Sequence, residues 1–283
     1  MAALVAAGGK RLRPALVLLA AKLGRYELQR LAEPAVAVEL THAATLVHDD
    51  VIDRAQVRRG RPTVATSHGT ESAIVIGDYY LVKAYELAAR SGSTAVVSTL
   101  ARAVMEICAG EVRQQSMRYV YALQEDDYLR WIHDKTAALL GACFDIGALL
   151  GGLGDDVRRA LHNYGINLGL AFQIADDVLD YTATEDEVGK PIGHDLLEGF
   201  ATLPVMLALK IGAVGRLDDR RRLEPGEART IAERIRNSEA PEMALERARE
   251  FASRARGELA AIPAGEVSST LAALTEYVVS RTF

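Results

Sequence analysis

Residues 166–181, INLGLAFQIADDVLDY, decide how this chain folds. Their apolar side chains occupy nearly every side of a helix, which is typical of a helix buried among others. Three aspartates, Asp176, Asp177 and Asp180, interrupt the end of this run. Because burying an unpaired carboxylate is costly, we expect a counter-charge close to these side chains.

A second aspartate cluster stands far upstream. Residues 48–53, HDDVID, repeat the DDxxD spacing with Asp49, Asp50 and Asp53. Residues four apart share one face of a helix, so the first and last aspartates of each cluster can point at one ion. A single DDxxD on a helix is more often a solvated surface. Both clusters, however, stand at the C-terminal end of an apolar helix, where the macrodipole disfavours negative charge by roughly 0.3–1 kcal/mol per group. A bound cation would offset that cost.

Magnesium fits these carboxylates better than other metals do. It prefers oxygen ligands and is typically bound by one or two carboxylates together with substrate phosphates. No spacing of Cys and His suits zinc, and the loops lack the Gly and Asn pattern of a calcium-binding hand. The sequence therefore predicts Mg²⁺ held by the two carboxylate clusters together with a phosphate-bearing ligand.

The rest of the chain also has helical patterns. Hydrophobic residues make up 49% of the 283 residues and are mostly Ala and Leu, while aromatic residues make up only 6%. This mixture favours packed helices over sheets. No change of composition marks a boundary, so we expect one all-α domain over residues 1–283, with amphipathic outer helices beyond about residue 213. The predicted helices span Glu33–Arg54, 72–90, 94–120, 126–153, Tyr164–Tyr181 and 201–212.

Charge and cysteine content narrow the function. The net charge of −5, with Lys and Arg scattered along the chain, argues against a nucleic-acid-binding surface. Cys108 and Cys143 stand in apolar helical runs, so we expect two reduced core residues of a cytoplasmic protein. The run LVLLAA near the start is too short to span a bilayer, and no transmembrane segment is expected.

Basic residues stand close to the aspartate clusters in the sequence. Six aspartates would repel a diphosphate, so metal ions and basic side chains must reverse the local charge. Taken singly, each basic residue is more often a surface charge than a ligand. Arg suits bidentate phosphate contacts, and Lys supplies a point charge. The candidates are Lys10, Arg11, Arg13, Arg58, Arg59, Lys135 and Lys190.

Nine short motifs follow one another along residues 8–204. They are GGKRLRP, ELTHAATLVHDDVID, RRGRPT, IGDYYL, CAGE, KTA, AFQIADDVLD, GKPIGHDL and TLP. Each motif is weak alone, but in this order and spacing they resemble the motifs of the trans-isoprenyl diphosphate synthases, the polyprenyl synthetase family. The resemblance implies a single bundle of long helices around a deep central cavity, of the isoprenoid synthase type, and a homodimer.

The resemblance also implies a role for each matching residue, and about two or three Mg²⁺ ions with the bound diphosphate. The metal-binding residues correspond to Asp49, Asp50 and Asp53, and to Asp176, Asp177 and Asp180. The groups that bind the allylic diphosphate correspond to Arg58, Lys135 and Lys190. The pocket for isopentenyl diphosphate corresponds to Lys10, Arg13, His42 and Arg59. The residues that line the reacting carbons correspond to Thr136 and Gln173.

The implied reaction is the head-to-tail (1'-4) condensation of an allylic diphosphate with isopentenyl diphosphate, which makes an all-trans polyprenyl diphosphate. Magnesium would stabilise the departing diphosphate, and an apolar cavity would keep water from the allylic cation. Two alternatives are a class I terpene cyclase and a subunit of a heteromeric polyprenyl diphosphate synthase. The residues of a second diphosphate pocket argue against the cyclase. Two intact aspartate clusters argue for a catalytic subunit over a regulatory one.

Two features bear on affinity and product length. The family usually has a basic residue where this chain has Phe200, so one diphosphate contact is missing. Ala44 and Thr45 precede Asp49 by five and four residues, and five residues are about 7.5 Å of helix rise. Small side chains there would leave the cavity open below the metals, for products of about four or more isoprene units. Ordinary helix packing is the alternative explanation for both residues.

Overall fold

The chain is helical almost throughout, which confirms the all-α prediction. A computed structural model describes residues 11–58, 60–183 and 192–280. Among these residues the strands are β1 (Val57–Arg58) and β2 (Arg61–Pro62), which pair antiparallel. The α-helices are α2 (Leu12–Ala21), α3 (Leu28–Ile52), α4 (Val64–His68), α5 (Thr70–Ala89), α6 (Thr94–Met117), α7 (Glu125–Ile132), α8 (Ala138–Gly151), α9 (Asp155–Thr182), α11 (His194–Leu197), α12 (Leu203–Lys210), α13 (Pro225–Arg236), α14 (Ala240–Glu258) and α15 (Glu266–Ser280).

The contacts divide the chain into two compact units. The first comprises residues 1–104 and 142–162, and the second comprises residues 105–141 and 163–283. Helices α6, α8 and α9 each continue from one unit into the other. The single domain expected over residues 1–283 stays a prediction.

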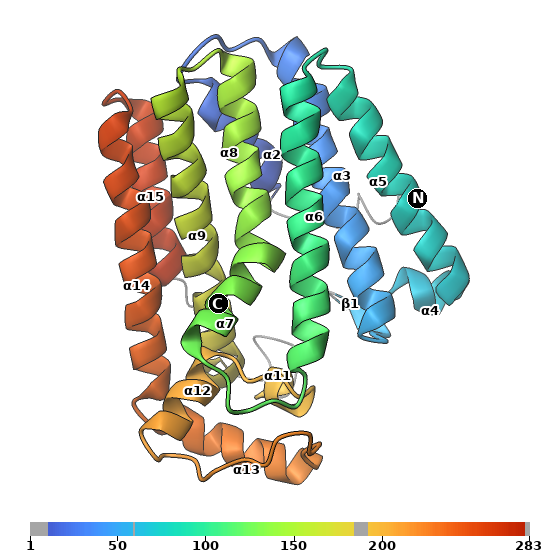
Figure 1. The fold of residues 1–283 in the computed structure, drawn as a ribbon, viewed down its shortest axis with the longest axis vertical. Coiled ribbons are helices and arrows are strands. Elements are labelled where there is room, and N and C mark those ends of the chain that lie inside the picture. The colour runs from blue at the N-terminus through green and yellow to red at the C-terminus, as the bar shows by residue number, and fades with distance from the viewer. Residues whose placement is uncertain (1–10, 59, 184–191, 281–283) are drawn as a thin grey trace. The chain divides into compact units, whose positions relative to one another are not determined.

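The first unit is built on the long helices α3 and α5, which lie side by side (Figure 1). Their shared core contains Ala44, Val47, Ala73 and Tyr80, all at least 95% buried. Small side chains at three of these four positions allow the two helices to approach closely. This packing holds the C-terminal end of α3, where the first aspartate cluster lies.

Helices α2 and α8 approach each other through a glycine in the first unit. A Cβ atom added at Gly147 would lie 2.3 Å from the carbonyl oxygen of Val17. No side chain can occupy that space unless one helix backbone moves. Glycine at this position therefore sets the distance between α2 and α8.

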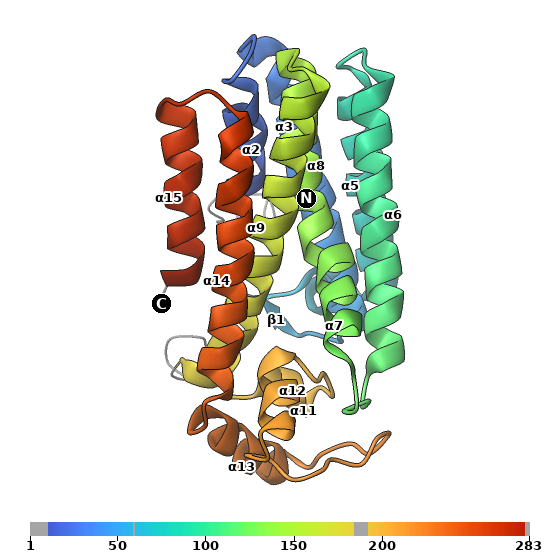
Figure 2. The same ribbon diagram turned by 60° about the vertical axis from the view of Figure 1, so that its left-hand side comes forward.

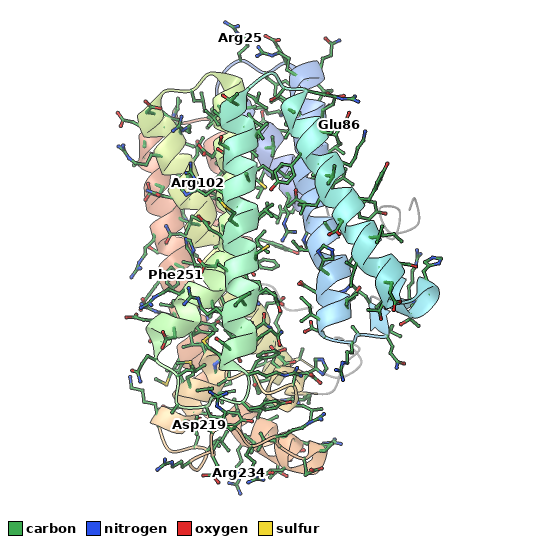
Figure 3. The ribbon with its side chains drawn as sticks, turned by 45° about the vertical axis from the view of Figure 1, so that its right-hand side comes forward. Arg25, Glu86, Arg102, Asp219, Arg234 and Phe251 are labelled. Atoms are coloured by element: carbon green, nitrogen blue, oxygen red, sulfur yellow. The ribbon has the colours of Figure 1, made fainter. Side chains whose placement is uncertain are left out.

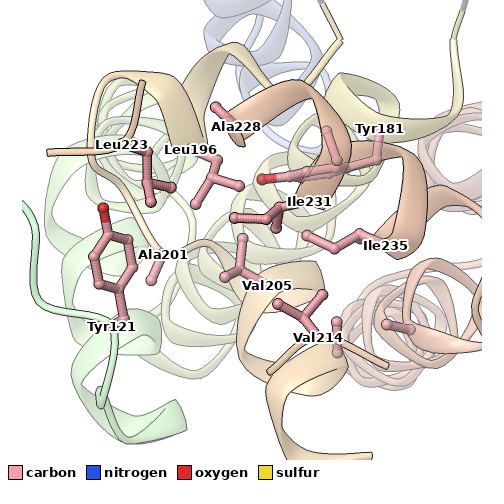
Figure 4. Packing of buried hydrophobic residues seen from close by; sticks show 13 residues of the cluster. Tyr121, Tyr181, Leu196, Ala201, Val205, Val214, Leu223, Ala228, Ile231 and Ile235 are labelled. Atoms are coloured by element: carbon pink, nitrogen blue, oxygen red, sulfur yellow. The ribbon is translucent and has the colours of Figure 1, made fainter. Parts of the chain in front are cut away.

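The second unit has its own hydrophobic cluster, formed by α11, α12, α13 and the segments around them (Figure 4). Its largest members are Tyr121 and Tyr181, packed with Leu196, Val205 and Ile231. Helix α13 begins with Pro225, whose missing N–H is not needed at the first helical position. Helices α14 and α15 run side by side in the same unit (Figure 2).

Most predicted helices are confirmed, although several begin or end at other residues and one is interrupted. The predicted helix 126–153 is two α-helices joined by a π-helical turn, His133–Ala137. The predicted helix 201–212 begins only at Leu203, because Thr202 has extended backbone as its N-cap. The helices expected beyond about residue 213 are confirmed as α13, α14 and α15.

The prediction of two core cysteines is half wrong. Cys143 is buried, but Cys108 is exposed, because the apolar run around it belongs to a helix with one exposed side. Within residues 11–58, 60–183 and 192–280, no helix is long and apolar enough to cross a bilayer.

Replacing Gly147 by alanine tests the approach of α2 and α8. Because the new methyl group would meet backbone and not a movable side chain, we expect the free energy of unfolding to fall by about 1–3 kcal/mol. Urea denaturation followed by circular dichroism at 222 nm measures it. Gly226→Ala is the matched control, since nothing lies within 4 Å of the added Cβ atom. Equal effects of the two substitutions would contradict the proposed close contact.

Candidate active site

The first aspartate cluster lies at the C-terminal end of α3, and its three carboxylates differ in surroundings. Asp50 is 1% exposed, and its Oδ1 accepts a hydrogen bond of 2.6 Å from Nε of Arg58. Asp49 is half-buried and Asp53 is exposed. The middle aspartate therefore faces the protein, while the first and last aspartates are more accessible to solvent.

The β1–β2 hairpin places Arg58 against Asp50. Gly60 makes the turn with φ +72°, a conformation that glycine adopts without steric cost. Thr63 fixes the far end of the hairpin, because its hydroxyl donates to the carbonyl oxygen of Ala55 at 2.8 Å and caps α4 through the N–H of Thr66. The RRGRPT string thus forms a turn that places the side chain of Arg58 beside Asp50.

His48, directly before the cluster, is a residue that the sequence analysis did not assign. Its ring packs on Gly77 of α5, where an added Cβ atom would lie 2.2 Å from Nε2 of His48. The same nitrogen lies 3.4 Å from Oδ1 of Asp78. In the sequence, the adjacent Gly77 and Asp78 of the IGDYYL string could have indicated this contact, because they provide the space and the carboxylate for the imidazole ring.

The second cluster repeats the arrangement of the first. Asp177 is 4% exposed and accepts hydrogen bonds from the hydroxyl of Tyr128 at 2.7 Å and from the amide of Gln173 at 2.8 Å. Asp176 is exposed and Asp180 is half-buried. Again the middle aspartate faces the protein.

Burial is the largest cause of the raised pKa values of Asp177 and Tyr128. It raises the pKa of the Asp177 carboxyl well above its usual value, and the Asp195 carboxylate raises this pKa further. Burial and the charge of Asp177 also raise the pKa of the Tyr128 hydroxyl. The Tyr128 hydroxyl therefore stays protonated, as its role of hydrogen-bond donor requires.

Asp180 holds the segment that follows α9. One of its carboxylate oxygens accepts a hydrogen bond of 3.1 Å from the backbone N–H of Asp195, and its carbonyl oxygen accepts one of 2.9 Å from Gly193. Gly193 has φ +73°. The GHDL string thus folds back on the second aspartate cluster.

Lys135 and Thr136 lie in the π-helical turn between α7 and α8. π-Helical turns occur frequently at functional sites. Two glycines allow neighbouring helices to pack closely against this turn. A Cβ atom added at Gly110 would lie 2.7 Å from the backbone nitrogen of Lys135, and one added at Gly169 would lie 2.5 Å from Cα of Ala137. The glycine of the CAGE string therefore has a steric purpose.

Lys135 lies within a group of polar side chains. Its Nζ donates to Glu111 at 2.7 Å and to Gln114 at 2.5 Å. Thr136 donates to Oε1 of Gln173 at 2.8 Å, and Gln173 in turn donates to Asp177. A continuous hydrogen-bonded chain therefore runs from Thr136 through Gln173 to Asp177 and Tyr128.

These residues surround a small cavity of about 120 Å³ in the second unit. Both polar side chains and aromatic rings line it. A cavity with these linings can hold a polar head next to an apolar group. Its main lining residues are Lys135, Thr136, Gln173, Asp177, Trp131 and Phe200.

Phe200 lines the cavity where the resemblance implies a basic residue. Its ring centroid lies 5.9 Å from that of Trp131, and the guanidinium of Arg118 lies 5.5 Å from it. Nε of Arg118 donates to the carbonyl oxygen of Glu198 at 2.7 Å. A cation is therefore present beside the ring, but it is paired with Glu198 and does not line the cavity.

The structure brings together only part of the predicted site. Arg13 and His42 belong to α2 and α3, which pack on each other. Lys10, Arg59 and Lys190 lie outside the described residues. The two aspartate clusters belong to different units, and their convergence across a cleft stays a prediction, as does every assigned role.

Magnesium is compatible with the carboxylates found here. Among the described residues, no group of three or more His, Cys, Asp or Glu forms a ready metal site. Asp49 and Asp53, and likewise Asp176 and Asp180, offer two oxygen donors on one helix face, which fits an ion that takes its remaining ligands from water and phosphate.

Replacing Tyr128 by phenylalanine tests the support of Asp177. The loss of one hydrogen bond to a buried carboxyl group should lower the free energy of unfolding by about 1–3 kcal/mol. Urea denaturation measures the change. Tyr26→Phe serves as the control, because Tyr26 is 42% exposed and should change stability by less than about 0.5 kcal/mol. A Tyr128→Phe variant as stable as this control would contradict the role of the hydroxyl.

Comparison with known proteins identifies the family. The chain is 39% identical to the heptaprenyl diphosphate synthase component 2 of Geobacillus stearothermophilus, over 99% of this chain and 88% of that protein. The crystal structure of heptaprenyl diphosphate synthase from Staphylococcus aureus matches 98% of this chain and 89% of that one, with a TM-score of 0.92 and 34% identity. The crystal structure of polyprenyl synthase from Caulobacter crescentus CB15, complexed with calcium and isoprenyl diphosphate, has a TM-score of 0.91 and 38% identity, and covers 98% of this chain and 86% of that one. The family model described as polyprenyl synthetase matches residues 1–233, and the chain belongs to this family.

Proposed function

We propose that this protein is a prenyltransferase that condenses an allylic diphosphate with isopentenyl diphosphate and elongates an all-trans prenyl chain. Membership of the polyprenyl synthetase family and the names of its heptaprenyl diphosphate synthase relatives support this function. The observation that carries it is the pair of DDxxD clusters, each with a buried middle aspartate and two more accessible neighbours.

The residues of the second unit suit the positive charge that forms in this reaction. When the carbon–oxygen bond of the allylic diphosphate breaks, the diphosphate leaves with the electron pair. The oxygens of Thr136 and Gln173 line the cavity and can face the allylic cation. The isopentenyl double bond then attacks the cation, and a proton leaves. Trp131 and Phe200 exclude water from the apolar part of the cavity.

We propose Mg²⁺ as the metal, in about two or three ions with bound diphosphate. A metal ion bound by the aspartates would neutralise the departing diphosphate. The calcium and isoprenyl diphosphate named in the Caulobacter crescentus structure support the proposal that a divalent ion binds together with a prenyl diphosphate. Asp49, Asp53, Asp176 and Asp180 are the proposed principal ligands, because the two members of each pair share one face of a helix, and the buried Asp50 and Asp177 lie beside them.

A second candidate function is that of the catalytic subunit of a heteromeric synthase. The word component in the name of the Geobacillus stearothermophilus relative supports this candidate. The homodimer, which the family resemblance implies, and the cytoplasmic location, which the cysteines suggest, stay predictions. Activity of the purified chain distinguishes the two candidates, because a subunit that needs a partner would be inactive alone.

An assay of the purified chain with Mg²⁺ tests the function and its aspartates together. With farnesyl diphosphate and radiolabelled isopentenyl diphosphate we expect longer prenyl diphosphates, and with farnesyl diphosphate alone no hydrocarbon. Asp49→Ala and Asp176→Ala should each lower the rate at least about 100-fold, by analogy with the loss of one preorganised charge-stabilising group. Near-normal activity of either variant would contradict its metal role.

Asp156→Ala is the control for the aspartate variants. Its side chain is 88% exposed and pairs with Arg159 three residues away, and such surface pairs contribute little. We expect unchanged turnover. Hydrocarbon from farnesyl diphosphate alone would favour the terpene cyclase, and an inactive purified chain would favour the heteromeric enzyme.

Product length is tested by a larger side chain below the first cluster. Ala44 is buried in the α3–α5 core beside Ala73 and Tyr80, which supports ordinary packing for this residue. Thr45 is half-buried, so Thr45→Phe can place a ring without filling that core. We expect shorter products by mass spectrometry. Val36→Phe, at a position that is 48% exposed on the same helix, is the control. An unchanged product distribution in Thr45→Phe would show that this position does not limit the chain.

A further inference from the structure

The largest cavity described in the second unit is separate from the candidate active site. It measures about 700 Å³, within the range of about 300–1,000 Å³ that is typical of ligand sites. Its walls are the segment 121–125, helix α12 and residues 216–219. No lining residue is shared with the cavity around Lys135.

Part of the cavity wall is apolar and incompletely covered. Five large aliphatic side chains pack on the buried cluster of Figure 4 and also line the cavity. Each is only partly buried, so each leaves apolar surface in contact with water. An apolar chain in the cavity would remove that surface from water. The five residues are Leu123, Met206, Leu207, Leu209 and Leu217.

The acidic groups of the lining are already used by the protein. A carboxylate oxygen of Asp219 (Figure 3) accepts hydrogen bonds of 2.7 and 3.3 Å from the backbone N–H groups of Tyr121 and Ala122. Glu125 accepts a hydrogen bond of 2.8 Å from Nε of Arg247. These two carboxylates therefore stabilise the wall of the cavity.

The two basic groups of the lining differ from these carboxylates in their pairing. Lys210 and Arg216 are both exposed, and neither is paired with a carboxylate of the described residues. They stand at the edge of a leucine-lined cavity, so a ligand with an apolar chain would bring its polar end to them. An anionic end would gain charge-assisted hydrogen bonds there.

We infer that this cavity binds a molecule with one long apolar chain and an anionic head group, the chain against the leucines and the head group at Lys210 and Arg216. A prenyl diphosphate and a fatty acid both have this chemistry. The inference does not depend on turnover at the aspartate clusters. It concerns binding through side-chain cations, which needs no metal ion.

Equilibrium dialysis in EDTA, without isopentenyl diphosphate, tests this site. The probes are geranylgeranyl diphosphate, palmitate and the uncharged alcohol geranylgeraniol. We expect both anions to bind and the alcohol to bind at least about tenfold more weakly. The tighter of the two anions identifies the natural head group as phosphate or carboxylate. EDTA removes the divalent ions that the aspartate clusters need, so the result is independent of the proposed catalysis.

Two variants locate the binding. Lys210→Glu with Arg216→Glu should weaken both anions at least about tenfold, and Ala122→Trp, at an exposed position of the lining, should fill the cavity and weaken all three probes. Lys22→Glu with Arg102→Glu is the matched control, since both residues are exposed and lie in the other unit. Failure of both anions to bind, equal binding of the alcohol, or equal effects of the charge reversals and their control would overturn the inference.

Discussion

The interaction on which the candidate site depends is the hydrogen-bonded burial of the middle aspartate in each DDxxD cluster. On a helix the second residue is rotated about 100° from the first, while the fifth returns close to it. Asp50 and Asp177 consequently face the protein, where Arg58 holds one and Tyr128 with Gln173 holds the other. A buried carboxyl group without these donors would be costly. Each cluster thus has an anchoring residue and a more accessible pair.

Glycines at close approaches give the site its remaining shape. Gly110 and Gly169 leave room for the backbone that carries Lys135, and Gly77 leaves room for the ring of His48. A methyl group at any of these positions would fall within 3 Å of a neighbouring atom, closer than packed atoms approach. The glycines of the IGDYYL and CAGE strings therefore have a steric role, because Gly77 gives room to the ring of His48 and Gly110 to the backbone at Lys135.

The sequence predicted the helices and the two clusters because both depend on local spacing. Apolar periodicity places α3 and α9, and the i, i+4 relation places the carboxylates at their ends. The partners of those carboxylates could not be predicted in the same way. Tyr128 is 49 residues from Asp177, and Glu111 is 24 from Lys135, so these pairs exist only after tertiary packing. The exposure of Cys108 was missed for a related reason: an apolar run does not say which side of its helix is covered.

With Phe200 in place of a basic residue, the charge of the cavity around Thr136 would depend on bound ions. Of the charged groups that line the cavity around Thr136, Lys135 is the one cation, against the acids Asp177 and Asp195, and Glu111 pairs with that cation at 2.7 Å. Arg118 lies behind the Phe200 ring and pairs with Glu198, so it adds no positive charge to the lining. Within the described residues, then, the protein groups of this cavity do not by themselves attract a diphosphate. In the proposed function the diphosphate would therefore bind together with divalent cations, and Asp176 is the most exposed aspartate of the second cluster.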